Sequence, residues 1–145
     1  MAYAHIAHDC QLGDYVTLAN VGTLAGHIVI EDRAILGGLA AVHQFVRIGR
    51  LSIVGGCSKV IQDIPPYSLC DGHPARVRSL NKVGLERAGV SKEAKTNLKH
   101  AFTILFNSGL TISHALKKVE EELPPTLEVT HLINFIKNSQ RGVCR

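Results

Sequence analysis

The sequence contains no tryptophan, and all aromatic residues together make up only 5% of its 145 residues. Its hydrophobic content of 46% is nevertheless typical of a globular protein, so most of the core must be aliphatic. No apolar run reaches the roughly 20 residues that a membrane-spanning helix needs. No charged stretch precedes an apolar segment, as it does in a secretory signal. We therefore expect no membrane insertion.

Paired cysteine motifs are also absent. The four cysteines, Cys10, Cys57, Cys70 and Cys144, form no C-x-x-C pair, and single buried thiols are typical of a reducing compartment. The sequence therefore predicts a cytoplasmic protein. The formal net charge of +4 suits an anionic ligand. No basic run is interleaved with aromatic residues, so we expect no nucleic-acid partner.

The first half of the chain repeats with a period of six residues. Ten consecutive hexapeptides begin with an aliphatic branched residue, namely Ile6, Leu12, Leu18, Leu24, Ile30, Leu36, Val42, Ile48, Val54 and Val60. An α-helix would spread a strict period of six around its axis, and an ordinary strand alternates with period two. The pattern predicts short strands joined by tight corners, which is the hexapeptide signature of a parallel β-helix.

The second half has a different character. Two prolines in "QDIPPY" interrupt the repeat because proline cannot donate to a strand ladder. "CDGHPAR" is rich in turn formers. We therefore predict β-helix coils over 1–66, a crossing loop over 67–80 and an α-helical domain over 81–145. The expected helical pieces cover about 81–88, 91–109, 112–123 and 127–139.

The repeat resembles that of the bacterial hexapeptide acyltransferases, whose fold is a left-handed parallel β-helix of triangular cross-section. The resemblance implies three hexapeptides per coil, so residues 18 apart stack on adjacent coils. His8 then lies below Gly26, and Asp9 lies below His27. The polar residues brought to neighbouring corners in this way are His5, His8, Asp9, Gly26, His27, His43 and Gln44.

These residue types together suit proton transfer. Histidine is the usual general base near neutral pH, and a neighbouring carboxylate can fix its tautomer. A glycine one coil above leaves room for a substrate, and its N–H is a candidate oxyanion donor. Each histidine alone is more simply a solvated surface residue. Four histidines converging with a carboxylate and a glycine indicate a site.

Six motifs make the resemblance specific. "AYAHIAHDC", "LAGH", "AVHQF", "VGGCS", "QDIPPY" and "LNKVGLERAG" occur in this order. They resemble the acyl-carrier-protein-dependent UDP-N-acetylglucosamine O-acyltransferases of lipid A synthesis over essentially the whole chain. The resemblance implies transfer of a long-chain (R)-3-hydroxyacyl group from acyl carrier protein to the 3-hydroxyl of UDP-N-acetylglucosamine. It also implies a homotrimer with active sites between subunits, without a cofactor or a metal.

The same resemblance implies roles for individual residues. His8 is the general base, Asp9 orients it, and the N–H of Gly26 holds the oxyanion. Gly56 lies where the acyl chain length is limited, although Gly55-Gly56 is also a plain corner pair. The residues implied to line the substrate site are His5, His27, His43, Gln44, Asn81 and Arg87.

The sequence also departs from the family pattern. Val83 and Ala88 stand where relatives can carry a glutamate and a second arginine, which affects the nucleotide contacts. His73-Pro74 replaces an Asn-x pattern. Family members have several more coils before "AYAHIAHD", so we expect this chain to match the C-terminal portion of such an enzyme. Outward apolar residues are expected around Val29, Leu39 and Val46, in keeping with a trimer.

Two other functions stay open. The γ-type carbonic anhydrases use the same prism and trimer with three zinc-binding histidines, and His5 and His8 are possible ligands here. However, His43 is followed by no second ligand within a few residues. The other alternative is a non-catalytic fragment or scaffold that keeps the fold without turnover.

Overall fold

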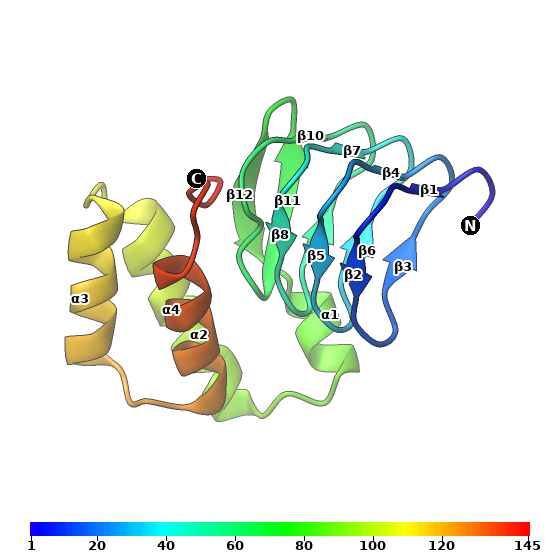
Figure 1. Ribbon diagram of the computed structural model, residues 1–145. Helices are drawn as coiled ribbons and strands as arrows, with labels where there is room; N and C mark the ends of the chain where they lie inside the picture. Colours follow the sequence, from blue (N-terminus) through cyan, green and yellow to red (C-terminus); the bar gives the residue numbers. More distant parts are fainter.

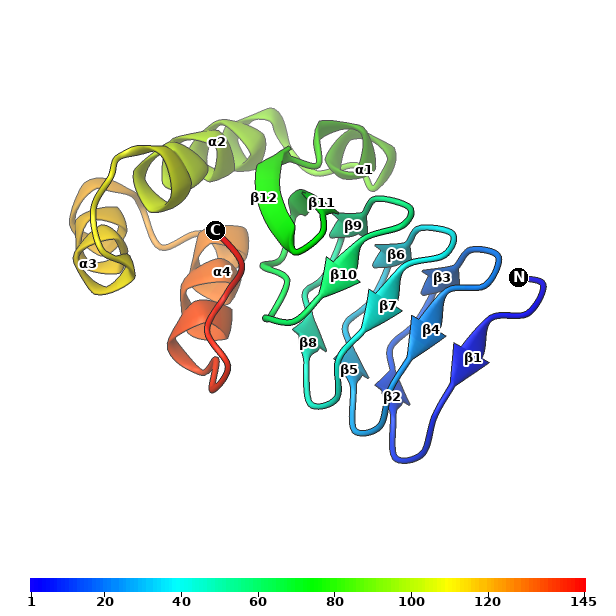
Figure 2. The same cartoon turned by 90° about the horizontal axis from the view of Figure 1, so that it is seen from above.

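The computed structural model describes all residues from Met1 to Arg145. A stack of short strands forms one region, and a group of helices lies at one end of that stack (Figure 1). In Figure 2 the strands follow one another from β1, beside the N-terminus, to β10, β11 and β12, beside the helices. The molecule therefore has the two regions that the change of period predicts.

Each hexapeptide contributes one strand of two residues. The strands are β1 (His5–Ile6), β2 (Gln11–Leu12), β3 (Thr17–Leu18), β4 (Thr23–Leu24), β5 (Val29–Ile30), β6 (Ile35–Leu36), β7 (Ala41–Val42), β8 (Arg47–Ile48), β9 (Ile53–Val54) and β10 (Lys59–Val60). They form three parallel sheets, in which β1-β4-β7-β10, β3-β6-β9 and β2-β5-β8 are neighbours.

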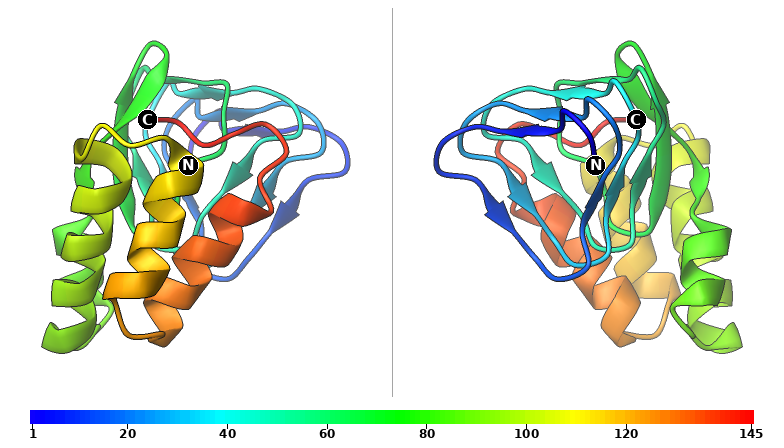
Figure 3. Two further views of the ribbon diagram at one scale, coloured as in Figure 1. Left: turned by 90° about the vertical axis from the view of Figure 1, so that its left-hand side faces the viewer. Right: turned by 90° about the vertical axis from the view of Figure 1, so that its right-hand side faces the viewer.

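The register of these sheets confirms the predicted coil length. His5 pairs with Thr23, and Gln11 pairs with Val29, so each residue pairs with the one that lies three hexapeptides further along the chain. Seen from the side of the N-terminal coil, the coils overlie one another in a roughly triangular outline (Figure 3, right). The fold is the predicted left-handed parallel β-helix.

The first residue of each hexapeptide points into the coil. From the second coil onward these side chains are at most 4% exposed, as seen for Leu24, Ile30, Leu36, Val42, Ile48 and Val54. Ile6 and Leu12, in the first coil of the given chain, are 49% and 36% exposed because within this chain only one neighbouring coil covers them. The outward position expected for Val46 is wrong: its side chain is fully buried in the β-helix, whereas Leu39 is exposed.

The corners have a feature that the repeat pattern did not reveal. The fourth residue of every hexapeptide except the last, and Tyr3 before them, has a φ between 54° and 66°, although none is a glycine. This left-handed backbone costs about 1–2 kcal/mol per residue for a side chain other than glycine. Hydrogen bonds between the corners of adjacent coils, such as that from the His27 N–H to the His8 carbonyl, help to offset the cost. Asp9, His27 and Phe45 occupy three such positions.

The prediction of a crossing loop over 67–80 is wrong, because this segment forms a β-hairpin. Strand β11 (Ser68–Gly72) continues the β3-β6-β9 sheet, and β12 (Ala75–Leu80) returns antiparallel to it. Leu69 pairs with Ile53, whereas the regular spacing would pair it with Leu51, so this coil is shorter than the others. Pro65 and Pro66 lie at its corner, between the Ile48–Ile64 bridge and β11, where no ladder N–H is needed.

The helices agree with their sequence signals. They are α1 (Lys82–Arg87), α2 (Lys92–Asn107), α3 (Ile112–Glu122) and α4 (Leu127–Lys137). The side chain of Ser91 accepts a hydrogen bond from the Ala94 N–H and so caps α2 where the helix was expected to begin. Phe102, Leu132, Phe135 and Ile136 are buried together, with Phe106 packed against them.

The last eight residues, 138–145, return to the β-helix, and we call them the return segment. Val143 forms a parallel bridge with Asp63, and Cys144 is buried in the β-helix core. This end of the expected helical domain therefore packs on the coils. No helix in the structure is both long and apolar enough to span a bilayer.

Candidate functional site

The site is built on the corner between the β1-β4-β7 sheet and the β2-β5-β8 sheet. Here the His27 N–H donates to the His8 carbonyl at 3.0 Å, and the Phe45 N–H donates to the Gly26 carbonyl at 3.1 Å. These bonds hold three successive coils in register across the corner. The predicted stacking of His8 below Gly26 and of Asp9 below His27 is confirmed.

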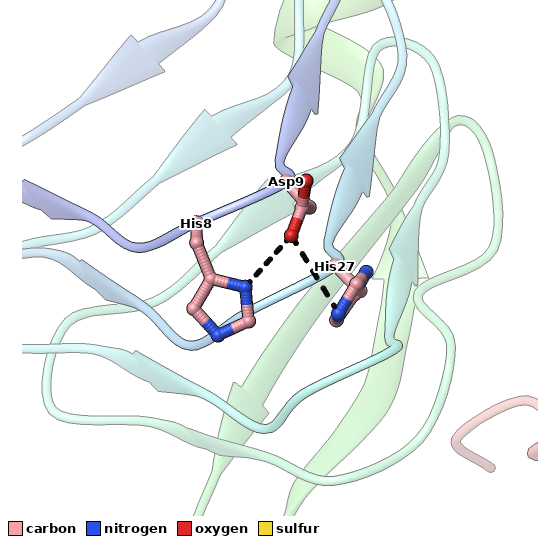
Figure 4. Close-up of side chains that lie close together, drawn as sticks. All are labelled: His8, Asp9 and His27. Atoms are coloured by element: carbon pink, nitrogen blue, oxygen red, sulfur yellow. Dashed lines mark hydrogen bonds and ion pairs between the residues drawn. The ribbon is translucent and has the colours of Figure 1, made fainter.

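Three side chains meet at this corner, as Figure 4 shows. His8 Nδ1 lies 2.9 Å from Asp9 Oδ2, and His27 Nε2 lies 3.8 Å from the same oxygen. The two imidazole rings are nearly perpendicular, with centroids 5.0 Å apart. All three residues are exposed, so a ligand can reach them from solvent.

The charge on Asp9 determines how His8 is protonated. The hydrogen bond from His8 and the charge of His27 hold the pKa of the Asp9 carboxyl below its usual range. At neutral pH the carboxylate can only accept hydrogen bonds, so the proton of a neutral His8 ring lies on Nδ1. Nε2 then carries the free lone pair and is the atom that can act as a base.

Gly26 shapes the space beside that atom. A Cβ added at Gly26 would lie 2.7 Å from His8 Cε1 and 2.8 Å from His8 Nε2. Glycine is therefore required for the ring to occupy its place. Gly26 is buried, and no group of the chain accepts a hydrogen bond from its N–H.

The other expected residues of this corner surround the cluster. His43 and Gln44 directly follow β7, and His43 Nδ1 lies 3.2 Å from the Gln44 carbonyl oxygen. His5 lies in β1 and is exposed, and no hydrogen bond or ion pair joins it to His8 or Asp9. The corner thus brings His43 and Gln44 close in the stack above Gly26, whereas His5 lies at the neighbouring strand.

Sequence reasoning missed Phe45. Its ring stacks on His27 with a centroid distance of 4.7 Å and an interplanar angle of 8°. Phe45 lies two coils above Asp9, so the same stacking arithmetic could have found it. By packing against His27, the ring fixes the orientation of the imidazole beside Asp9.

A second group of expected residues lines another corner. A cavity of about 250 Å³ lies between this corner and α1, and it includes the exposed Arg87. Asn81 also borders it but is buried: its Nδ2 donates to the Leu51 carbonyl at 2.9 Å, and its Oδ1 accepts from the Gly84 N–H at 3.1 Å. Asn81 therefore anchors α1, which carries Arg87. The Nδ2 and Oδ1 atoms of its side chain thus each make one hydrogen bond within the chain.

The same cavity contains residues that the sequence did not single out. Arg33 lies over the Tyr15 ring, with its guanidinium carbon 4.9 Å from the ring centroid. The two occupy the same repeat position and stack on adjacent coils. Val83 also borders the cavity. The charged residues that line the cavity are thus the arginines Arg33 and Arg87, with no carboxylate among them.

Gly56 lies on the third edge of the prism. It stacks above Gly38 and is exposed, and a Cβ added to it would lie 3.1 Å from the Gly38 carbonyl oxygen. A side chain at Gly56 would thus project from this edge with only one tight backbone contact. Within one chain the His8 corner, the Arg87 cavity and Gly56 lie on three different edges.

The cluster also has ligand types that suit a metal ion. One ligand atom each from His8, Asp9 and His27 lies within 4.8 Å of the others. Zinc accepts imidazole nitrogen and carboxylate oxygen, and a catalytic site uses three protein ligands. His5, one of the two ligands considered from the sequence, is not in this group. The hydrogen bond of His8 to Asp9 equally suits a base that works without a metal.

Comparisons with known proteins agree with one another. Residues 63–144 match the family model described as "Udp N-acetylglucosamine O-acyltransferase; Domain 2". An acyl-[acyl-carrier-protein]–UDP-N-acetylglucosamine O-acyltransferase of Anaeromyxobacter dehalogenans is 44% identical over the whole chain, which covers 56% of that relative. One from Gloeothece citriformis is 45% identical over 96% of the chain and 50% of the relative.

Solved structures have the same architecture. The crystal structure of a UDP-N-acetylglucosamine acyltransferase from Bacteroides fragilis matches 98% of the chain with a TM-score of 0.95 and 38% identity, over 56% of that protein. An Arabidopsis enzyme of the same name matches 98% of the chain with a TM-score of 0.92 and 36% identity, over 53% of that protein. The chain thus spans about half the length of the relatives it matches.

Proposed function

The chain belongs to the UDP-N-acetylglucosamine O-acyltransferase family, and on this premise we propose that the whole protein carries out the family's transfer. It moves a long-chain (R)-3-hydroxyacyl group from acyl carrier protein to the 3-hydroxyl of UDP-N-acetylglucosamine, the first step of lipid A synthesis. The observation that carries the proposal is the His8–Asp9 pair packed against Gly26. The four free cysteines are consistent with a cytoplasmic reaction.

The proton steps use His8. Its Nε2 removes the proton from the sugar hydroxyl, and the oxygen attacks the thioester carbon of the acyl carrier. The resulting imidazolium is stabilised by the Asp9 carboxylate 2.9 Å from Nδ1. When the tetrahedral intermediate collapses, the C–S bond breaks, and the imidazolium returns the proton to the departing thiolate. His8 thus ends the cycle in its starting form.

The Gly26 N–H supplies the electrophilic part of the proposal. The attack places negative charge on the former carbonyl oxygen, and a fixed backbone donor stabilises such charge. This amide has no acceptor within the chain and lies beside the His8 ring. The base that activates the hydroxyl and the donor that stabilises the oxyanion thus lie at the same corner.

The remaining substrate contacts involve two subunits. His5, His27, His43 and Gln44 line the sugar and acyl pocket near His8. The diphosphate is bound by Arg87, which α1 and its anchor Asn81 hold at a different edge of the prism. We therefore propose a homotrimer in which Arg87 of one chain completes the site at the His8 corner of its neighbour. Exposed apolar side chains on the β-helix, such as Leu39 and Phe45, suit the subunit contacts.

The acyl chain extends along the subunit boundary towards Gly56. Because Gly56 has no side chain, the groove stays open at that depth and admits a long hydroxyacyl chain. Its exposure in the single chain is consistent with this position at a groove.

The experiment is a transfer assay on the full-length protein with a long-chain 3-hydroxyacyl carrier protein and UDP-N-acetylglucosamine. We expect His8→Ala to lower kcat by about 10²–10⁴-fold while the protein keeps its fold and its nucleotide binding. The matched control is His100→Ala, which removes an exposed histidine of α2 paired with Glu122. Equal turnover of the two variants would remove His8 from the base role. A folded wild-type protein without turnover would favour the scaffold alternative.

A further inference from the structure

Two cysteines from distant parts of the chain touch in the interior. Cys70 lies on β11, and Cys144 lies in the return segment. Their Sγ atoms are 3.5 Å apart, and the residues are 0% and 3% exposed. The other two cysteines are elsewhere, Cys57 exposed at a corner and Cys10 partly buried.

We propose that Cys70 and Cys144 form a modification site. A small-molecule disulfide such as glutathione disulfide oxidises the two thiols to a reversible intramolecular disulfide. The S–S bond length is about 2.05 Å, so the two sulfurs have to approach by about 1.5 Å. The existing contact between the two sulfurs leaves only this small movement to be made.

The return segment is placed so that this bond would join the two regions of the molecule. Its backbone pairs with the β-helix, because the Asp63 N–H donates to the Gly142 carbonyl at 2.9 Å and the Cys144 N–H donates to the Asp63 carbonyl at 3.0 Å. At the same time Arg145 Nη2 donates to the carbonyls of Leu105 and Leu110, at 2.8 and 2.7 Å, at the end of α2. A covalent link at Cys144 would therefore fasten the helices to the coils.

The exchange balances without any other reactant. One cysteine thiolate attacks a sulfur of glutathione disulfide, whose S–S bond breaks and releases one glutathione thiolate. The second cysteine then attacks the mixed disulfide and releases the second glutathione. Both thiol protons end on glutathione, which is reduced as the two cysteines are oxidised.

The two thiols differ in how readily they ionise. Their mutual hydrogen bond lowers the pKa of Cys70 and, together with burial, raises the pKa of Cys144. Ser68 Oγ, 3.3 Å from Cys70 Sγ, further favours the Cys70 thiolate. Cys70 is therefore the attacking residue, and Cys144 resolves the mixed disulfide.

Burial sets the rate of the reaction. Neither sulfur faces solvent, so the oxidant reaches Cys70 only when the return segment lifts from the β-helix. The exposed Cys57 requires no such opening. We expect Cys57 to react first and the buried pair to react at the slower rate of local opening.

The test uses the chain with Cys10→Ser and Cys57→Ser, so that only the buried pair remains. The folded protein is incubated with glutathione disulfide, alkylated and digested with trypsin without reduction. We expect the peptides 60–76 and 142–145 to be joined, with a mass two hydrogens below their sum and with reversal by dithiothreitol. The thermal midpoint of the oxidised protein should rise by an amount on the order of 10 °C.

Cys144→Ser in the same background is the matched control and should show neither the linked peptide nor the higher midpoint. The proposal is wrong if Cys70 stays glutathionylated without linking to Cys144. It is also wrong if no link forms during an incubation many times longer than the one that fully modifies Cys57 in the parent chain. If Cys144→Ser does not fold, the linked peptide in the two-cysteine protein still decides the question.

Discussion

The β-helix and the helices bury aliphatic side chains by different geometric rules. In the β-helix a residue such as Leu24 stacks between Ile6 and Val42, which occupy the same repeat position one coil before and one coil after it. In α2 a residue such as Leu98 packs against other helices through a face repeated every 3.6 residues. Burial in the β-helix therefore depends on the adjacent coils. The side chain at a given repeat position can thus contribute differently to the free energy of unfolding in different coils.

Leucine truncation should show this difference most strongly. Leu24→Ala and Leu98→Ala each remove a fully buried side chain, and we expect each to lower the free energy of unfolding by about 3 kcal/mol or more. Leu12→Ala removes the same side chain from the same repeat position, but Leu12 is 36% exposed, so about 1 kcal/mol is expected. Urea unfolding of the three variants measures the values. Equal losses for Leu12 and Leu24 would mean that the first coil is covered in solution.

Glycine substitutions sharpen the comparison, because glycine lets adjacent coils approach closely in the β-helix and allows a positive φ at the end of a helix. A Cβ at Gly37 would meet the Gly56 nitrogen at 2.6 Å and the Val54 carbonyl oxygen at 2.7 Å, both in the next coil. Gly109 instead ends α2 with a φ of 77° and has nothing within 4 Å of an added Cβ. We expect Gly37→Ala to cost about 3 kcal/mol through overpacking, and Gly109→Ala about 1 kcal/mol through backbone strain.

Thermal or urea unfolding of these two variants provides the measurement. Gly38→Ala is the matched control within the β-helix, since its nearest contact, the Asn20 carbonyl oxygen, would be 3.3 Å from the added Cβ. A loss for Gly37→Ala as small as that for Gly38→Ala would show that adjacent coils can move apart. The idea of a rigid stack of coils would then fail.

Much of the packing in both regions could be predicted from the sequence, because buried residues recur every six positions in the β-helix and about every 3.6 positions in the helices. The aliphatic residue every six positions predicted the short strands and the burial of Leu24, the family resemblance supplied the coil of three hexapeptides, and the change to a helical period predicted α2. The stacking of His8 with Gly26 followed from the same arithmetic.

The sequence did not predict features that depend on contacts between residues far apart in the chain. Pro65 and Pro66 suggested the end of the coils, but a corner needs no N–H from them, and the ladder resumes at β11. The hydrogen bonds of the Asn81 amide to Leu51 and Gly84 were also not predicted. No pattern of residue types reveals such partners, because they depend on how α1 lies against a coil distant in sequence.

The proposed length limit at Gly56 tests the β-helix edge further. Gly56→Met should place a side chain in the acyl groove and shift the preference of the full-length enzyme from a fourteen-carbon to a ten-carbon donor by about tenfold or more. Each buried methylene contributes about 0.8 kcal/mol, so excluding a few of them is enough. Competition between the two donors measures the ratio. Leu127→Met, at an exposed position of α4, is the control. An unchanged preference would leave Gly56 as an ordinary corner glycine.

The smallest expected effect concerns two carboxyl groups, one in each region. The pKa of Asp9 at the β-helix corner is lowered chiefly by the hydrogen bond from His8, and the pKa of Glu86 on α1 is lowered by Lys95. A lowered pKa means that the stabilising contact is complete above the unfolded carboxyl pKa of about 4 and is lost as the pH falls through the folded value.

His8→Ala should therefore raise the pKa of Asp9 towards its ordinary value and leave that of Glu86 in place. His27→Ala should raise the pKa of Asp9 less, since the charge of His27 is a smaller cause than the hydrogen bond. Carboxyl carbon chemical shifts measured between about pH 2 and pH 6 would give both midpoints in one titration. If the Asp9 midpoint did not move in His8→Ala, the 2.9 Å contact would not persist in solution. The tautomer that leaves Nε2 free as a base would then lose its physical basis.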